Sequence, residues 1–330
     1  MHYAQLTIDC PAKLNLVLHV GKKILSGPKT GYHRVETLMA TLALADTLTV
    51  DVEPAAHAQF ELHCNGIAIE TPAQNNLVTR AYRALLPELP PLAITATLSK
   101  KIPVQAGLGG GSSNAAAMLV ALNTLAQLPQ QTLLARAQTL GADVPFFVHS
   151  LLNQSALSHW SGLGDSLHRD YQAAFFTAQT APEPLNALTH DQIIIVKPHD
   201  AAVATPEAYQ WLDAVKTNAP AIDACASVIH ALERQAPLAE WPVCNDFQGV
   251  VRQKNPDIQS AMKRLRDLGC KPVLLCGSGA AVAGLMSPLL VSLDADQLAN
   301  ALPKNEFWHC VTHIQVPTGI LSHTPLHVSR

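Results

Sequence analysis

Charged residues are scarce in this chain of 330 residues, and the scarcity excludes several classes of protein. Only 14% of the residues are Asp, Glu, Lys or Arg, and the formal net charge is −3. A protein that binds nucleic acid or an anionic membrane surface usually carries a basic run or patch. The sequence has no long basic run. We therefore expect neither nucleic acid nor a membrane among its partners.

Long apolar runs and a leader-like start are also missing. No stretch of about 18 or more uninterrupted apolar residues occurs, which predicts no transmembrane helix. Residues 1–4 are not a basic segment leading into an apolar one, which predicts no signal peptide. The seven cysteines are scattered and form no Cys-x-x-Cys pair. This usage is typical of free thiols in a reducing compartment, so we expect a cytoplasmic protein.

His309, Cys310 and His313 are close enough in the sequence to suggest a metal site. Two histidines and a thiol near a C-terminal strand are more often ordinary core or surface residues than ligands. We therefore predict no metal site there.

Apolar residues, at 48%, are plentiful enough for a substantial core, and the length suggests one large or two medium domains. Strand and helix patterns mix without strict alternation, which favours an α+β fold with two domains meeting near residues 150–190. Residues 149–165 are read as a loop or domain crossing, and 59–69 as a hairpin turning at Asn65-Gly66. Strands are expected over 7–20, 41–53, 92–98, 192–196, 272–276 and 280–286. Helices are expected over 77–86, 115–125, 131–140, 206–215, 224–232 and 257–268.

A glycine-rich loop is the most informative feature of the chain. Four of the five residues from Gly107 to Gly111 are glycine, and Ser112 and Ser113 follow at once. Glycine lets the backbone adopt positive φ angles and lets a ligand approach the amides closely. The apolar run from Ala115 predicts a helix whose unpaired N–H groups point towards the loop. The arrangement suits a polyphosphate.

The loop differs from the commoner phosphate loops. A Walker A loop needs a lysine before Ser112, and a dinucleotide fingerprint needs a glycine at that position. The His-Arg-Asp and Asp-Phe-Gly tripeptides of protein kinases are absent. A flexible linker is disfavoured because a buried-looking strand and an apolar helix flank the glycines.

Three segments together resemble the motifs of the kinase superfamily that includes galactokinase, homoserine kinase and mevalonate kinase. They are Pro11–Asn15, Gly107–Ser113 and Gly277–Gly279. Two more, Gly31–His33 followed by Glu-Thr-Leu and Leu140–Pro145, resemble the substrate loop and aspartate segment of the 4-diphosphocytidyl-2-C-methyl-D-erythritol kinase family.

The resemblance implies a two-domain fold. Residues 1–160 would form an N-terminal domain resembling the ribosomal protein S5 domain 2-like fold, with the glycine loop and the aspartate. Residues 161–330 would form a C-terminal α/β domain. The protein would be a monomer or a homodimer.

The resemblance also implies an ATP-dependent kinase that phosphorylates the 2-hydroxyl of its cytidyl substrate, a step towards isoprenoid precursors. Asp143 would be the general base and Lys13 its electrostatic partner, which favours the charged carboxylate. The alternative for Asp143 is an N-cap of the segment starting at Val144. The alternative for Lys13 is a strand lysine that extends its ammonium group to solvent.

On the nucleotide side, the family's ATP segment matches a continuous stretch of this chain. Ser113 would also meet Mg²⁺, which phosphates and water would mostly hold. Lys100 would lie near the adenine, with a surface lysine as the alternative. The predicted ATP-binding residues are Lys100, Pro103, Val104, Gln105, Ala106, Gly107, Leu108, Gly109, Gly110, Gly111, Ser112 and Ser113.

On the acceptor side, the substrate would present a cytidine diphosphate group. Asn15 would bind its polyol end, and Tyr32 and His33 would bind the cytosine ring. Tyr209, in the segment that begins at Thr205, would close the other side of that ring. The predicted substrate-binding set is completed by Gly277, Ser278 and Gly279, whose alternative is a simple hairpin turn.

The match departs from the family pattern at two places. Gln105 and Ala106 stand where the family often has glycine or another small residue. Residues 149–161 form a longer insertion than usual, and Gly162–Asp165 would be a displaced glycine turn. Two rivals stay open: a sister kinase acting on homoserine, mevalonate or a sugar, and a non-catalytic ligand sensor of the same fold.

Overall fold

The computed structural model describes residues 4–171, 192–215, 224–234, 236, 240–286 and 295–324. The strands are β1 (Ala4–Lys23), β2 (His33–Pro54), β3 (Gln59–Gly66), β4 (Leu92–Lys100), β5 (Leu157–Ser161), β6 (Ser166–Asp170), β7 (Gln192–Pro198), β8 (Cys244–Asn245), β9 (Val273–Leu275), β10 (Val282–Met286), β11 (Phe307–Thr312) and β12 (Ile320–Thr324). The α-helices are α1 (Leu77–Leu85), α2 (Gly110–Ala126), α3 (Gln130–Leu140), α4 (Val144–Asn153), α6 (Thr205–Val215), α7 (Ala224–Glu233), α8 (Phe247–Lys254), α9 (Pro256–Asp267) and α10 (Ala295–Ala301).

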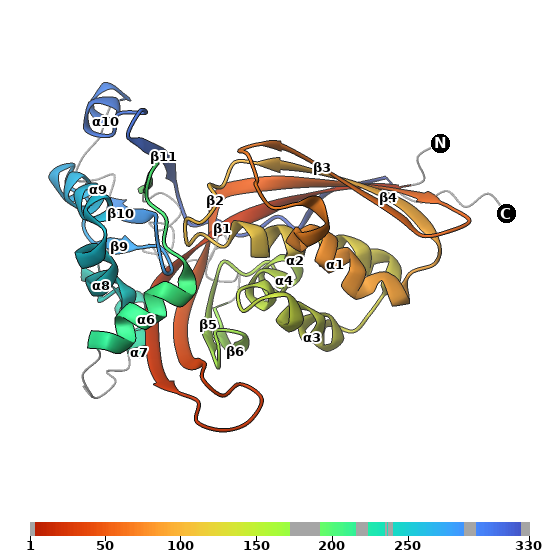
Figure 1. Ribbon diagram of the computed structural model, residues 1–330, viewed down its shortest axis with the longest axis horizontal. Helices are drawn as coiled ribbons and strands as arrows, with labels where there is room; N and C mark the ends of the chain where they lie inside the picture. Colours follow the sequence, from red (N-terminus) through yellow and green to blue (C-terminus); the bar gives the residue numbers. More distant parts are fainter. Residues whose placement is uncertain are drawn as a thin grey trace.

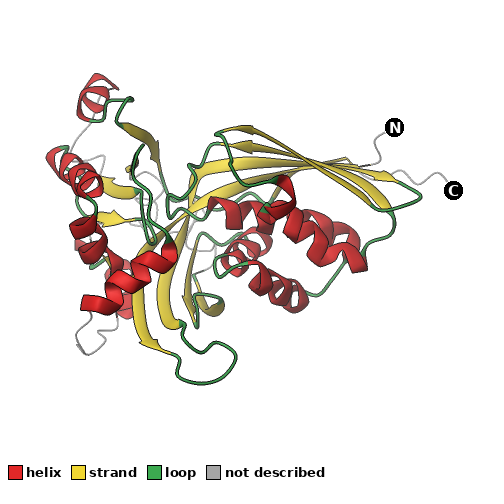
Figure 2. Cartoon of the chain, viewed as in Figure 1, coloured by secondary structure: helices red, strands yellow, loops and turns green. Residues whose placement is uncertain are grey.

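The larger sheet is built on two long strands, β1 and β2, which pair antiparallel along most of their length. Its order is β12-β1-β2-β4-β3, with β5 and β6 continuing from β2, and β8 pairing with β1. Side chains along β4 alternate between buried and half-buried, as expected for a strand with one face on a core. Helices α1 to α4 supply that core on one face of the sheet (Figures 1 and 2).

The smaller sheet has the order β11-β7-β10-β9, and all of its pairs are antiparallel. Helix α9 packs against it, and its apolar positions Ile258, Met262 and Leu265 are buried there. One apolar cluster contains Leu14 of β1 together with Ile195 of β7, so the two sheets share a core. Strand β12, near the end of the chain, lies in the larger sheet beside β1. The domain division at residue 160 stays a prediction.

The mixture of helices and sheets confirms the predicted α+β class. The predicted hairpin over 59–69 is wrong, because β3 ends at Gly66 and pairs parallel with β4. A Cβ atom on Gly66 would lie 2.2 Å from the Lys100 carbonyl oxygen, so this glycine permits a close strand approach rather than a hairpin turn.

The expected loop over residues 149–165 is also wrong. Helix α4 continues to Asn153, and β5 pairs with β2, so the segment belongs to the larger sheet. Residues 162–165 form the turn between β5 and β6, with positive φ angles at Gly162 and Gly164. Within the described residues, no helix combines the length and the apolar character needed to cross a membrane.

Candidate active site

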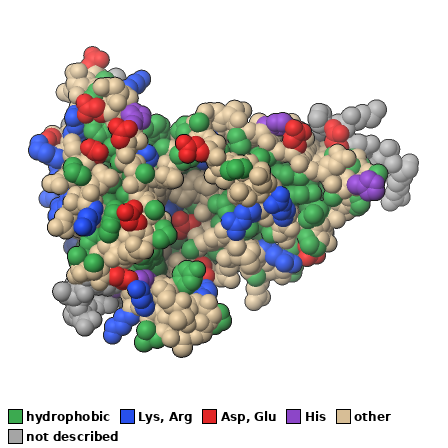
Figure 3. Space-filling model, in the orientation of Figure 1, with side chains coloured by type: hydrophobic (Ala, Val, Ile, Leu, Met, Phe, Trp, Pro, Cys, Tyr) green, Lys and Arg blue, Asp and Glu red, His purple; other side chains and the backbone are tan. Residues whose placement is uncertain are grey.

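The glycine loop lies between two cavities. The first has a volume of about 370 Å³ and the second about 250 Å³, and both are lined by Gly107, Gly109 and Ser112. Helix α2 begins at Gly110, so its free N–H groups face the region where the cavities meet. Figure 3 shows a hollow in the surface between the elements of the larger sheet and those of the smaller sheet.

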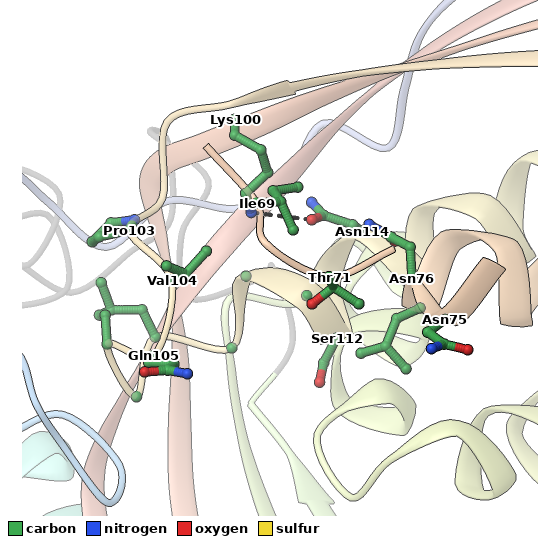
Figure 4. Close-up of a pocket in the computed structure, with 17 residues that line it drawn as sticks. Ile69, Thr71, Asn75, Asn76, Lys100, Pro103, Val104, Gln105, Ser112 and Asn114 are labelled. Atoms are coloured by element: carbon green, nitrogen blue, oxygen red, sulfur yellow. Dashed lines mark hydrogen bonds between the residues drawn. The ribbon is translucent and has the colours of Figure 1, made fainter. Parts of the chain in front are cut away.

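The first cavity is lined by the predicted ATP segment, from Pro103 to Ser112, and by Lys100. Its other side is formed by a segment that sequence reasoning missed, the connection between β3 and α1 (Figure 4). The missed lining residues are Ile69, Thr71, Asn75, Asn76, Leu77 and, from α2, Asn114. Ser113 is fully buried and lines neither cavity, whereas its neighbour Ser112 lines both.

Gln105, where the sequence departs from the family pattern, adopts a left-handed conformation with φ of 51°. Such a conformation is uncommon for a residue with a side chain and is tolerated where the surroundings hold it in place. The Gln105 carbonyl accepts a hydrogen bond from Ala280 N at 3.1 Å, and the Ala106 carbonyl accepts one from Ala281 N at 3.2 Å. The glycine loop is thereby joined to the chain that follows Gly277–Gly279.

The start of the loop is anchored by Asp46 of β2, which is fully buried. Its Oδ1 accepts hydrogen bonds from the backbone N–H groups of Lys101 at 2.7 Å and Ile102 at 2.8 Å. Its Oδ2 accepts from Asn114 Nδ2 at 2.9 Å and pairs with the Lys100 ammonium. Lys100 also donates to Asn114 Oδ1 at 3.1 Å (Figure 4). The surface-lysine alternative for Lys100 is therefore wrong.

We expect Asp46→Asn to destabilise the protein by about 3–5 kcal/mol, the scale for leaving a buried ammonium without its partner. It should also raise the KM for ATP, because this carboxylate accepts hydrogen bonds from the chain before the glycine loop and from Asn114 just after it. Urea unfolding and steady-state kinetics measure the two effects. Asp51→Asn on the same strand is the control, since its carboxylate meets the exposed Gln5 amide. Equal stability of the two variants would contradict the anchoring role.

The second cavity contains the residues predicted to carry the chemistry. Lys13 Nζ lies 3.7 Å from Asp143 Oδ2, and both side chains line the cavity. Lys13 donates to Asn15 Oδ1, and Asn15 Nδ2 donates to Thr37 Oγ1 at 2.8 Å. The β1–β2 register shifts on both sides of this pair, between Pro11 and Lys13 and after Asn15. Bulges of this kind re-aim side chains next to functional sites.

The structure bears on the two alternatives, a solvent-directed Lys13 and a capping Asp143. Lys13 is 4% exposed, so it does not extend to solvent. Its backbone N–H donates to the Leu108 carbonyl at 2.9 Å, which ties β1 to the glycine loop. Asp143 occupies the N-cap position of α4, but its side chain makes no capping hydrogen bond there. Its carboxylate is about one-third exposed, and it faces the cavity.

Aromatic rings form one side of the second cavity. Tyr209 lines it, and burial together with the Asp143 charge raises the pKa of this phenol to about 12. The Tyr209 ring stacks on His33 with centroids 5.0 Å apart and meets the edge of Phe247. His33 Nε2 lies 2.8 Å from Asp213 Oδ1. Tyr32 is 61% exposed and lines neither cavity.

The second glycine segment completes the site. Gly277 and Ser278 line the second cavity, and Ser278 Oγ lies 3.0 Å from Thr205 Oγ1. Asn245 holds this turn, donating to the carbonyls of Leu275 at 2.8 Å and Gly277 at 2.7 Å. Desolvation by burial raises the pKa of Cys276 to about 12, so this thiol is neutral near Lys13.

Several further residues line the second cavity without having been predicted. They are Leu18, Val35, Thr37, Ala142, Leu163, Gly164 and Phe247. The turn between β5 and β6 therefore borders this cavity. Among the described residues, the ligand atoms of His309, Cys310 and His313 do not form a group that could hold a metal ion. One such group of side chains does come together, and it lies elsewhere.

Comparison with known proteins agrees with this geometry. Residues 76–150 match the GHMP kinases N terminal domain. The chain is 35% identical over 281 residues to a 4-diphosphocytidyl-2-C-methyl-D-erythritol kinase of Bacteroides thetaiotaomicron, covering 84% of this chain and 90% of that protein. A kinase of the same name from Acaryochloris marina is 30% identical over 325 residues, covering 93% and 95%.

Solved structures of kinases are also similar to this chain. A crystal structure of 4-(cytidine 5'-diphospho)-2C-methyl-D-erythritol kinase superposes with a TM-score of 0.65 at 30% identity, covering 93% of this chain and 99% of that one. Homoserine kinase from Cytophaga hutchinsonii shares the fold with a TM-score of 0.62 at 15% identity, covering 95% of each chain. The chain belongs to the 4-diphosphocytidyl-2-C-methyl-D-erythritol kinase family.

Proposed function

We propose that this protein transfers the γ-phosphoryl group of ATP to the 2-hydroxyl of 4-diphosphocytidyl-2-C-methyl-D-erythritol. The observation that carries the proposal is the shared wall of the two cavities at Gly107, Gly109 and Ser112. A nucleotide in the first cavity would present its γ-phosphate at this wall, and an acceptor in the second would meet it from the side of Asp143. Membership of the kinase family supports the same reaction.

In this proposal, each residue of the site has its own part in the reaction. As the acceptor oxygen bonds to the γ-phosphorus and the bond to the ADP oxygen breaks, Asp143 accepts the hydroxyl proton. Lys13 stabilises the carboxylate and the charge on the transferring group. The amides at the start of α2 hold the phosphates. Asn15, fixed between Lys13 and Thr37, positions the polyol.

Magnesium fits this donor set only as a companion of the phosphates. Asp143 is the single carboxylate among the described residues that line the two cavities, so the protein supplies no cage of oxygen ligands. The Ser112 hydroxyl, which faces both cavities, would add one ligand, and phosphate oxygens and waters the others. A bound Mg²⁺ would neutralise charge on the β- and γ-phosphates.

We expect Tyr32→Ala to raise the KM for the cytidyl substrate by roughly 5- to 150-fold, the scale of one stacked base. Tyr32 would close on the cytosine from the loop, with Tyr209 forming the wall behind it. Turnover at saturation and the KM for ATP should stay near wild type. Leu25→Ala is the control, because this side chain is 88% exposed on the same loop. An unchanged substrate KM in Tyr32→Ala would remove Tyr32 from the cytosine site.

The reaction is tested by ADP release from ATP and magnesium with the cytidyl substrate. Thermal shifts with CDP, CMP, homoserine and galactose then report acceptor recognition without turnover. Stabilisation by CDP, with or without CMP, supports the cytosine site, and stabilisation by homoserine or galactose would assign a sister activity.

A further inference from the structure

A second group of chemically active side chains lies outside the kinase site. Glu36 of β2, His159 of β5 and Cys225 of α7 each bring one ligand atom to within 4.8 Å of the other two. His159 Nε2 lies 3.0 Å from Glu36 Oε1. His159 is 7% exposed and Cys225 is fully buried. None of the three lines the two cavities of the kinase site.

The cluster forms because three segments distant in sequence meet behind the second cavity, the one that contains Lys13 and Asp143. Val35 and Thr37 line that cavity, so alternation along β2 places the Glu36 side chain on the opposite face of the sheet. His159 reaches this face because β5 pairs with β2, with His159 opposite Leu38. Cys225 comes from the first turn of α7 and belongs to the apolar cluster shared by the two sheets.

We propose that Glu36, His159 and Cys225 form a zinc site that fastens α7 to the back of β2. A carboxylate oxygen, an imidazole nitrogen and a thiolate sulfur are the ligand types of zinc. The carboxylate and the thiolate together balance the two positive charges of the ion. Bonds of about 2.0–2.3 Å hold tetrahedral ligand atoms roughly 3.5 Å apart. The His159–Glu36 pair, at 3.0 Å, would therefore open slightly, and the longer separations, of up to 4.8 Å, would shorten.

The surroundings favour a structural zinc site over other uses of these residues. A carboxylate, histidine and cysteine can also form a nucleophilic set, but Cys225 is fully buried and offers no surface to a substrate. Calcium and magnesium prefer all-oxygen ligands, which the thiol excludes. The ring of exposed His168 lies 4.6 Å from that of His159, and this imidazole or a water would take the fourth position.

The proposal is tested on the full-length protein after removal of metal with a chelator. Zinc chloride, added in competition with a chromophoric chelator, should bind at one equivalent per chain and raise the melting temperature. Cobalt chloride should give the near-ultraviolet charge-transfer band of a thiolate ligand. Cys225→Ser and His159→Gln should weaken zinc binding by at least about 100-fold, more than changes in residues that only support a ligand.

One control variant and one milder cluster variant complete the test. Cys270→Ser also replaces a buried thiol, but one outside the cluster, and should retain the cobalt band. Glu36→Gln changes a partly exposed side chain, so it should fold normally and still weaken zinc binding. Binding weaker than micromolar in the wild type, or unchanged stoichiometry in all three cluster variants, would overturn the proposal. ADP release without added zinc tests the kinase activity separately, so the two proposals can fail independently.

Discussion

Replacing Asp143 by Asn should lower kcat by roughly 10²–10⁴-fold, the usual scale for the loss of a general base. The carboxylate lies 3.7 Å from Lys13 Nζ at the wall of the second cavity, and it makes no capping hydrogen bond. An amide of the same shape cannot take the proton from the acceptor hydroxyl. Because Asp143 does not line the first cavity, where we propose that ATP binds, the KM for ATP should change little. Rapid-quench measurement of the chemical step checks the prediction.

Lys13, which lies beside Asp143, provides a second test of the pair. Lys13→Met should also reduce kcat, and the double variant should lose less than the product of the two single effects, because the pair acts as a unit. The melting temperature of Asp143→Asn should stay near wild type. A wild-type kcat in Asp143→Asn would leave Asp143 with no role beyond its place at the start of α4.

Replacing Gly107 by Ala should abolish most ATP binding, with a KM for ATP at least about 10-fold higher. Gly107 has φ of 74°, and a left-handed conformation costs a residue with a side chain about 1–3 kcal/mol. The new Cβ would also lie 1.9 Å from the Cys276 carbonyl oxygen. The Cys276 carbonyl oxygen cannot move away on its own, because the backbone around it is held by hydrogen bonds. Cys276 N donates to the Ala281 carbonyl oxygen, and Ala281 N donates to the Ala106 carbonyl oxygen.

A second glycine of the same loop gives a matched control. At Gly111 the backbone is helical and the added Cβ would meet only Leu77 Cδ1 at 3.4 Å, an ordinary contact. Gly111→Ala should therefore keep the wild-type melting temperature, whereas Gly107→Ala should lower it. Because Gly111 lines the first cavity, the KM for ATP is compared only between Gly107→Ala and the wild type. Equal melting temperatures in the two variants would contradict the close contact of Gly107 with the chain around Cys276.

Local patterns in the sequence predicted the parts of the site that depend on local geometry. Alternation along β1 placed Lys13 and Asn15 on one face, and their hydrogen bond confirms it. The glycine run followed by small apolar residues predicted a loop that opens a helix, and α2 begins at Gly110. The roles of these residues in the reaction stay predictions.

The parts that depend on contacts between distant segments could not be predicted. In the sequence, Asp46 is one more polar residue in an alternating strand. Its anchoring role follows only from its hydrogen bonds to the chain before the glycine loop. Asn65-Gly66 is typical of a hairpin turn, but the parallel partner β4 overrode that local preference. The sequence also did not predict the stacking of His33 on Tyr209; the contact of Tyr32 with a cytosine ring stays a prediction.

The measurement that tests the central claim most directly is ADP release from ATP and magnesium, run with 4-diphosphocytidyl-2-C-methyl-D-erythritol beside homoserine, mevalonate and galactose. We predict rapid release with the cytidyl substrate alone, and almost none from Asp143→Asn under the same conditions. Release with a different acceptor would keep the phosphate loop and discard the cytosine site. No release with any acceptor, although ATP binds, would contradict the kinase proposal and favour a non-catalytic ligand sensor.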